Sequence, residues 1–173
     1  MLGPGNYVLF SPAGIGFTGI ADAATVGFIY GLDAGHYFTA GKRFAAALGG
    51  FFEHAIVNFL PGEGPPSSDF ILHSLRLGTI LRLGVRFKRL FAYGLGRLGT
   101  DLTLNYDLTD YDYMTGKSTT QHYKVYPWVI GSAGVGVQGL LGRRFLLGGE
   151  GVGDIGGEAF LQFRFSVLLG VRF

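Results

Sequence analysis

Residues 159–173, the last segment of the chain, alternate between two kinds of side chain. The apolar positions are Ala159, Leu161, Phe163, Phe165, Val167, Leu169, Val171 and Phe173. The positions between them include Gln162, Arg164 and Arg172. Successive side chains on a strand point to opposite faces, so this alternation predicts a β-strand with one apolar and one polar face. Such an apolar face is longer than the usual strand of about 5–6 residues, which favours a strand that crosses an apolar layer.

Charged residues obey the same alternation elsewhere. Arg76, Arg82 and Arg86 share one face of segment 70–86, and Arg97 and Asp101 share one face of segment 90–105. A soluble antiparallel sandwich also alternates. Its polar face would be solvated and rich in Lys, Glu and Thr, whereas the polar face here combines Gly with Arg. The pattern therefore favours a membrane barrel with the polar face inside and the apolar face toward lipid.

Three basic turns divide the chain. They are Gly41-Lys42-Arg43-Phe44, Phe87-Lys88-Arg89-Leu90 and Gly142-Arg143-Arg144-Phe145. The stretches 61–69 and 107–121 have loop-forming composition, and shorter breaks occur near 21–24 and 151–156. Three tight turns and four other connections predict eight strands. Their expected ranges are 7–20, 25–40, 44–60, 70–86, 90–105, 123–141, 145–152 and 157–173.

A repeat of this spacing could also indicate a propeller or a solenoid, but three copies are too few for a propeller and the strands are too long. We therefore expect one domain over residues 1–173: an all-β, eight-stranded, antiparallel, up-and-down transmembrane barrel. Hydrophobic residues make up 48% and charged residues 15%, against roughly 25% charged in an ordinary soluble domain.

Several other classes are excluded or disfavoured. No uninterrupted apolar run reaches the about 18 residues of a membrane-spanning helix. No cysteine is present, so disulfides and thiolate metal sites are excluded. The first residues lack a secretory signal, which suggests a mature form. The net charge of +2 gives no reason to expect a nucleic-acid partner, and Gly94–Gly99 has the spacing of a dinucleotide-binding loop without a following helix. We expect no cofactor.

The charged residues occupy the strand positions that face the inside of the barrel, and they therefore predict an ionic network there. Eight strands make a barrel just wide enough to be filled by side chains, and buried charges are tolerated when they pair. The predicted network comprises Asp33, Glu53, Arg76, Arg82, Arg97, Asp101, Lys124, Glu150, Glu158 and Arg164. Arg86 and Arg172 share its parity. The interior is therefore expected to be plugged, with a conducting pore as the alternative.

With strands, turns and parity assigned, the chain resembles the small eight-stranded outer-membrane barrels of the OmpA/OmpX type. The most specific element is the alternating C-terminal strand that ends in Phe173. A terminal Phe is similar to the signal read by the outer-membrane barrel assembly machinery. The resemblance implies a bacterial outer membrane of the Gram-negative type, contact with lipid and lipopolysaccharide, periplasmic termini and extracellular long loops.

In that orientation the basic turns would meet the inner headgroups, where Lys42, Arg43, Lys88, Arg89, Arg143 and Arg144 would be attracted to phosphates. Each such cation contributes on the order of 1 kcal/mol. The alternative is that they are solvated turn residues. An aromatic girdle is expected beside them, formed by Phe44, Phe87, Phe91, Phe145 and Phe173.

The resemblance also includes barrels that modify lipid A, so catalysis on lipid A is an alternative function. The barrel deacylases use a lipid-facing His-x-Ser, but His73 is followed directly by Ser74, which takes the opposite face. The palmitoyltransferase barrels use His, Asp and Ser at the outer rim. Ser67, Ser68 and Asp69 with His54 and His73 could supply that set, although their spacing specifies nothing. No catalytic residue is assigned.

His36, His54 and His73 take the lipid-facing parity, and pairing across the loop 61–69 would bring His54 and His73 together. A joint metal site is conceivable. Contact with lipopolysaccharide headgroups is the favoured interpretation, so no metal site is assigned.

Small residues gather on the predicted lipid face of the fifth to seventh strands. They are Ala92, Gly94, Gly96, Gly131, Ala133, Gly139, Gly149 and Gly151. Glycine can relieve strain where a small barrel bends. Alternatively, another membrane protein packs there, because small residues let backbones approach closely inside a membrane.

The segment Tyr106–Tyr123 alternates Tyr with Asp107, Asp110 and Asp112, so it could bind a partner, a polysaccharide or a cation, or be a solvated loop. The sequence favours a non-catalytic structural or interaction barrel, which could be a subunit of a larger envelope complex. A lipid-A-modifying enzyme and a small passive pore remain the alternatives.

Overall fold

The computed structural model describes residues 4–20, 23–40, 42–59, 70–103, 106–112, 114, 116–123, 127–156 and 160–173. Eight strands form a closed barrel, in which each strand pairs antiparallel with its neighbour and β1 pairs with β10. They are β1 (Gly5–Ile20), β2 (Ala23–Ala40), β3 (Phe44–Phe59), β4 (Phe70–Phe87), β5 (Leu90–Thr103), β8 (Trp128–Leu141), β9 (Phe145–Gly156) and β10 (Phe160–Arg172). The predicted all-β, eight-stranded antiparallel barrel is confirmed. No helix in the described ranges is long and apolar enough to cross a membrane.

Two further strands lie outside the barrel wall. β6 (Tyr106–Asp112) and β7 (Lys117–Tyr123) pair with each other as a separate two-stranded sheet. The sequence prediction treated 107–121 as an irregular loop and began the next barrel strand at residue 123, which was wrong. A polar, Asp-rich composition does not exclude a β-hairpin, so composition alone missed it.

The seventh barrel strand is longer than predicted. Residues 151–156 read as a break because Gly is frequent there, but β9 continues to Gly156 and pairs with β8 and β10 along its length. Side-chain packing against β10 compensates for the weak strand propensity of Gly at these positions. The extension adds Asp154 to the interior, a residue that the prediction omitted.

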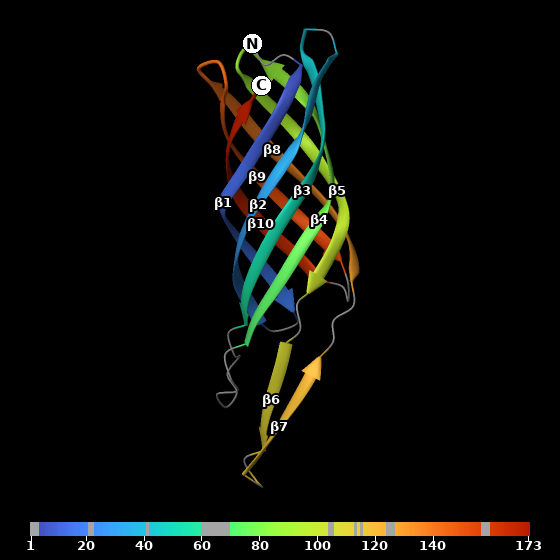
Figure 1. Cartoon of the computed structure of the whole chain (residues 1–173), viewed down its shortest axis with the longest axis vertical. Helices are drawn as coiled ribbons and strands as arrows, with labels where there is room; N and C mark the ends of the chain where they lie inside the picture. The colour runs from blue at the N-terminus through green and yellow to red at the C-terminus, as the bar shows by residue number, and fades with distance from the viewer. Residues whose placement is uncertain are drawn as a thin grey trace.

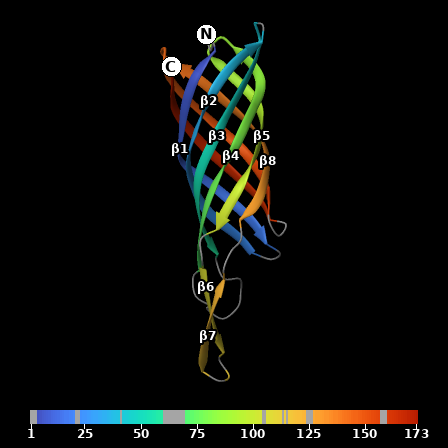
Figure 2. The same cartoon turned by 45° about the vertical axis from the view of Figure 1, so that its right-hand side comes forward.

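The two ends of the barrel differ. The three basic turns connect β2 to β3, β4 to β5 and β8 to β9, and they lie at the same end as both termini (Figure 1). We call this the turn end. The β6–β7 hairpin projects from the opposite end, here called the loop end, in both ribbon views (Figures 1 and 2). Two of the basic turns have a residue with a left-handed backbone: φ is 49° at Lys88 and 66° at Gly142.

Inward-facing glycines allow the wall to curve tightly. Gly35 lies opposite Gly49, and Gly78 lies opposite Gly99. A Cβ on Gly78 would lie 2.2 Å from the carbonyl oxygen of Leu98, and one on Gly35 would lie 2.3 Å from that of Leu48. The backbones approach too closely here for any side chain. The strain relief expected of glycine therefore occurs on the inner face.

The two classes of glycine predict different tolerance to substitution. We expect Gly78→Ala to lower the free energy of unfolding by about 1–3 kcal/mol, because the added methyl overpacks against backbone. Gly96→Ala is the control: it faces outward with nothing within 4 Å of an added Cβ, so a change within about 0.5 kcal/mol is expected. Urea unfolding in detergent micelles, followed by Trp128 fluorescence, measures both. Equal losses would contradict this assignment.

Candidate functional site

The barrel interior contains a continuous network of buried charges. Of the ten predicted members, eight lie inside and are at most 9% exposed: Asp33, Glu53, Arg76, Arg82, Arg97, Asp101, Glu150 and Arg164. They come from six different strands, whose inward parity brings them together. Lys124 and Glu158 lie outside the described residues. Asp154 is a ninth buried member.

Arg76 and Arg164 lie in the part of the network nearer the loop end. Arg76 donates from Nε to Asp101 at 2.8 Å and from Nη1 to Asp154 at 2.9 Å. Arg164 lies 3.6 Å from the other Asp154 oxygen and donates to Glu53. Each guanidinium therefore links two carboxylates, a geometry for which its planar fork is suited.

Arg82 is the most enclosed charge. Its side chain is fully buried, and it donates from Nε to Glu150 at 2.7 Å, from Nη1 to the Tyr7 hydroxyl at 3.1 Å, and from Nη2 to Asp33. Arg97 connects this group to the rest, since it donates to Glu150 at 3.0 Å and to Glu53. The network thus spans the inside of the barrel without a break.

Neutral polar groups complete it, and the sequence analysis missed most of them. The Tyr93 hydroxyl donates to Glu150 at 2.9 Å, Ser74 donates to Asp101, and Tyr37 donates to Gln138. Tyr93, Ser74 and Tyr37 share the inward parity of the charges on their own strands. That parity was the available signal: it assigned Ser74 to the inner face, but it was not applied to Tyr37 or Tyr93.

Toward the turn end the interior becomes apolar and aromatic. The apolar plug, as we call it, includes Tyr7, Leu9, Tyr37, Ala45, Ala47, Phe91, Tyr93, Leu140, Leu146 and Leu168. Phe91 is completely buried, so its predicted place in the outer girdle was wrong. It shares the parity of Tyr93 and Arg97, which points inward. A cavity lined by Asp33, Glu53 and Arg97 holds only about 10 Å³, about enough for one water molecule.

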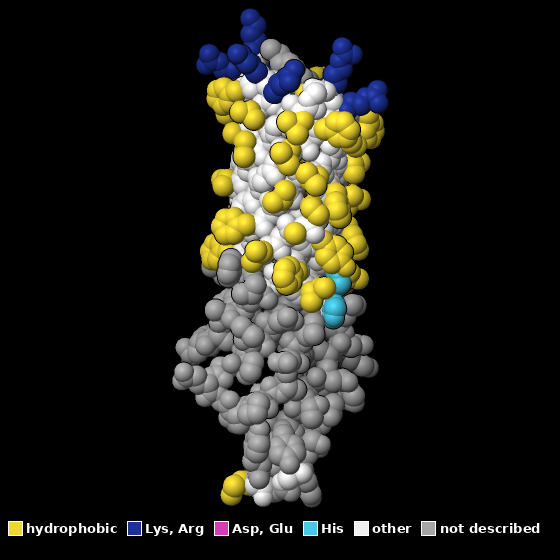
Figure 3. All heavy atoms as spheres, turned by 90° about the vertical axis from the view of Figure 1, so that its left-hand side faces the viewer, with side chains coloured by type: hydrophobic (Ala, Val, Ile, Leu, Met, Phe, Trp, Pro, Cys, Tyr) yellow, Lys and Arg dark blue, Asp and Glu magenta, His cyan; other side chains and the backbone are white. Residues whose placement is uncertain are grey.

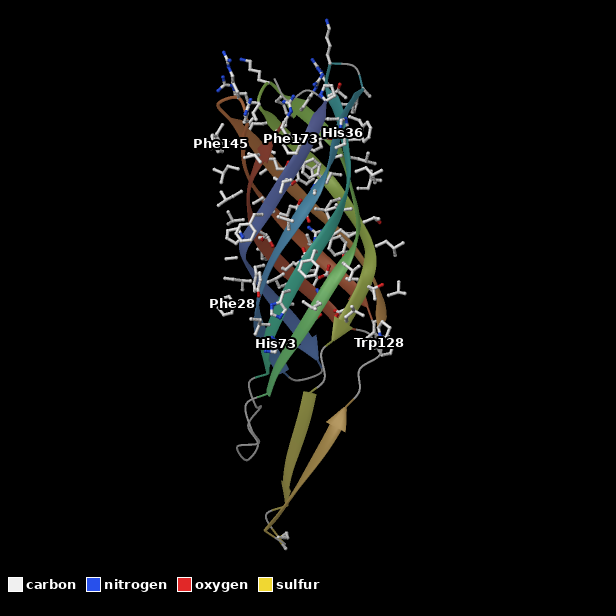
Figure 4. The ribbon with its side chains drawn as sticks, in the orientation of Figure 1. Phe28, His36, His73, Trp128, Phe145 and Phe173 are labelled. Carbon is white, nitrogen blue, oxygen red and sulfur yellow. The ribbon has the colours of Figure 1, made fainter. Side chains whose placement is uncertain are left out.

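The outer surface is a broad apolar band. At the turn end, aromatic rings stand outward from Phe44, Phe87, Phe145 and Phe173, each at least 59% exposed. The Lys and Arg side chains gather beyond them in a cap (Figure 3). At the loop end, Phe28 and Trp128 are also exposed (Figure 4). The band is therefore bounded by aromatic residues at both ends, with cations at one.

The small-residue face divides into a covered and an open part. The ring of Phe165 lies 3.2 Å from a Cβ built on Gly151, and Leu90 lies 3.4 Å from one on Gly139. Nothing lies within 4 Å of a Cβ built on Gly96 or Gly131. The open part, which we call the β5–β8 recess, consists of Ala92, Gly94, Gly96, Gly131 and Ala133. Gly96 lies directly opposite Ala133 in the β5–β8 register.

The three histidines whose side chains the structure describes lie at two locations. His54 and His73 are hydrogen-bonded on the outer surface near the loop end, whereas His36 bonds Asn6 near the turn end. Ser74 points inward to Asp101, away from His73. Ser67, Ser68 and Asp69 lie outside the described residues. The described geometry therefore brings no serine to the histidine pair.

Comparison with solved structures finds the same architecture. Neisserial surface protein A superposes with a TM-score of 0.61 at 16% identity, over 99% of both chains. Ail, the attachment invasion locus protein of Yersinia pestis, crystallised with the heparin analogue sucrose octasulfate, gives 0.56 at 11% identity, over the whole of both chains. No protein-family model and no curated protein matches the chain. Identities this low show the fold: the chain has the closed eight-stranded barrel of small outer-membrane proteins.

Removing the central cation tests the network. Arg82→Ala leaves Asp33 and Glu150 buried without it, so we expect the free energy of unfolding to fall by about 3–5 kcal/mol. Arg143→Ala, in an exposed turn, is the matched control and should change it by less than about 0.5 kcal/mol. Urea titration of micelle-folded protein compares them. A loss at Arg82 no larger than the control would show that the network contributes little.

Proposed function

We propose that this chain is an integral protein of the bacterial outer membrane that acts as a sealed, non-catalytic scaffold and presents an interaction surface to another membrane protein. The observation that carries the proposal is the contrast between the two faces of the wall. Inside, paired charges and the apolar plug fill the barrel; outside, an apolar band surrounds it.

The outer surface supports insertion in a membrane. Large apolar side chains such as Leu98 and Val129 are more than 60% exposed, which is unfavourable in water and favourable in lipid. Closure of the barrel pairs the strands all around the wall, as a bilayer requires. The similarity to known outer-membrane barrels supports the same location.

The proposed orientation places the termini in the periplasm and the β6–β7 hairpin outside the cell. The six turn cations, Lys42, Arg43, Lys88, Arg89, Arg143 and Arg144, would then meet anionic groups of the inner leaflet. Phe173 would end the strand that the barrel assembly machinery recognises. Lipopolysaccharide would surround the loop end.

The β5–β8 recess supports a protein partner within the membrane. Its glycines have open space outside them, so the barrel fold does not require their small size. Without a hydrophobic driving force between surfaces in lipid, close van der Waals contact is what favours association. The Ala and Gly positions of the recess, bordered by the exposed side chains of Leu98 and Val135, allow that contact with a helix or with another barrel.

The hairpin is a poor match for a polyanion. Its sequence contains Asp107, Asp110 and Asp112 against Lys117. Ail was crystallised with a sulfated heparin analogue, but like charge disfavours such a ligand at this hairpin. We therefore assign the interaction role to the membrane-embedded wall.

A sealed interior predicts no ion conduction. Protein reconstituted in planar bilayers should give no steady current above that of the bare membrane, because side chains fill the interior from the Arg76 level to the apolar plug. Stable single-channel steps would instead favour the passive-pore alternative.

Filling the recess should remove the partner. We expect Gly96→Leu combined with Gly131→Leu to abolish co-purification and cross-linking of the partner from native membranes, while the barrel still folds. Gly50→Leu, an outward glycine on β3 with no atom closer than 3.5 Å to an added Cβ, is the control and should retain the complex. Complexes that persist in the double variant would refute a partner at this face.

A further inference from the structure

Three side chains form a hydrogen-bonded chain on the outside of the barrel near its loop end. Tyr30 on β2 lies directly opposite His54 on β3, and His73 on β4 lies diagonally beyond it. All three face outward; Tyr30 and His73 are exposed and His54 is half-buried. Figure 4 shows His73 at this end of the apolar band, at a level similar to Trp128. The surrounding outward positions, including Leu32 and Leu77, are apolar.

The spacing of the two imidazoles suits a shared metal ion. His54 Nε2 lies 3.2 Å from His73 Nδ1. Zinc binds histidine nitrogens at about 2.0–2.1 Å. When the nitrogen–metal–nitrogen angle lies between its octahedral and tetrahedral values, the two nitrogens are roughly 2.9–3.4 Å apart. The ion would lie beside the line that joins these nitrogens, so the two imidazoles, whose planes are 15° apart, would turn about their side-chain bonds to direct both lone pairs at it while the strands stay in place.

The Tyr30 hydroxyl can accept a hydrogen bond from the tautomer of His54 that this requires. His54 Nδ1 lies 2.5 Å from the Tyr30 hydroxyl, and the two rings meet edge to face. With the proton on Nδ1, directed at the hydroxyl oxygen, Nε2 presents its lone pair. Metal-binding histidines almost always donate their second ring N–H to an oxygen in this way. His73 can move its proton from Nδ1 to Nε2 through solvent, so both rings bind as neutral imidazoles.

We propose that His54 and His73 form a two-histidine site for a divalent transition-metal ion, with Tyr30 as the residue that positions His54. Imidazole selects Zn²⁺, Cu²⁺ or Ni²⁺ over Mg²⁺ and Ca²⁺. The described residues contain no cluster of three or more His, Cys, Asp or Glu side chains that could hold a metal, so His54 and His73 are the two protein ligands among them. The bound ion links β3 to β4 near the ends of both strands.

Titration of Zn²⁺ into the untagged barrel, folded in a phosphate-free non-ionic detergent, tests the site by calorimetry. The wild type should bind one ion, and His54→Ala or His73→Ala should weaken binding at least about tenfold. Tyr30→Phe should weaken it by about ten- to a hundredfold while keeping the same stoichiometry, as expected for a residue that orients a ligand.

The chain offers a matched control in its other two histidines. The double variant His36→Ala and His122→Ala keeps only the pair and should bind like the wild type, and Mg²⁺ should not compete. Unchanged Zn²⁺ binding in the His54→Ala and His73→Ala double variant would overturn the proposal, as would wild type that does not saturate.

A spectroscopic measurement needs no variant of the pair. Cu²⁺ added at one equivalent to the His36→Ala and His122→Ala protein should show two nitrogen ligands by electron paramagnetic resonance. A spectrum with one nitrogen ligand or none would also overturn the proposal.

Discussion

The pairing of β1 with β10 is the constraint on which the rest of this structure depends. Closure removes the free sheet edges, so the wall satisfies its backbone hydrogen bonds without help from solvent. Closing only eight strands also fixes a narrow interior and a strongly curved wall. The curvature brings backbones so close that Gly35, Gly49, Gly78 and Gly99 have no room for a side chain. Those inward glycines are a consequence of strand number.

The narrow interior in turn decides how charge is buried. Arg82 has no solvent contact, so its buried charge is stabilised by hydrogen bonds to Asp33, Glu150 and Tyr7. Each partner is held on a different strand, which means that the network also fixes the register of the wall. Toward the turn end, Phe91 and Tyr37 meet edge to face and fill the interior without charge. A barrel built in this way has a rigid, occupied centre, and it interacts with other molecules through its outer surface and its loops.

Much of the barrel and of its inner face could be predicted from the sequence. Side chains alternate between the two faces of a strand, so a charged residue indicates which positions of that strand point inward. Arg76, Arg82 and Arg86 were enough to assign the inward face of β4, and the final alternating segment did the same for β10. The prediction failed where composition was used in place of parity. Phe91 was assigned to the girdle because it follows a basic turn, and Asp154 was lost because glycines around it resembled a break. Contacts between strands distant in sequence, such as those of Arg164 with Glu53, depend on closure and the shear of the barrel, which no local pattern contains.

Some residues are required by the barrel fold, and others are not. Closure and pairing account for Gly78, for Arg82 and for the aromatic plug, since each would be destabilising to replace. They do not account for Gly96 or Gly131, which have open space outside them, because Leu or Val would cover the lipid face equally well. They do not account for His54 and His73 either, which occupy outward positions between apolar neighbours. Residues that neither the barrel nor the lipid requires are the ones whose identity points to interactions with other molecules, and here they occur at two separate places on the wall.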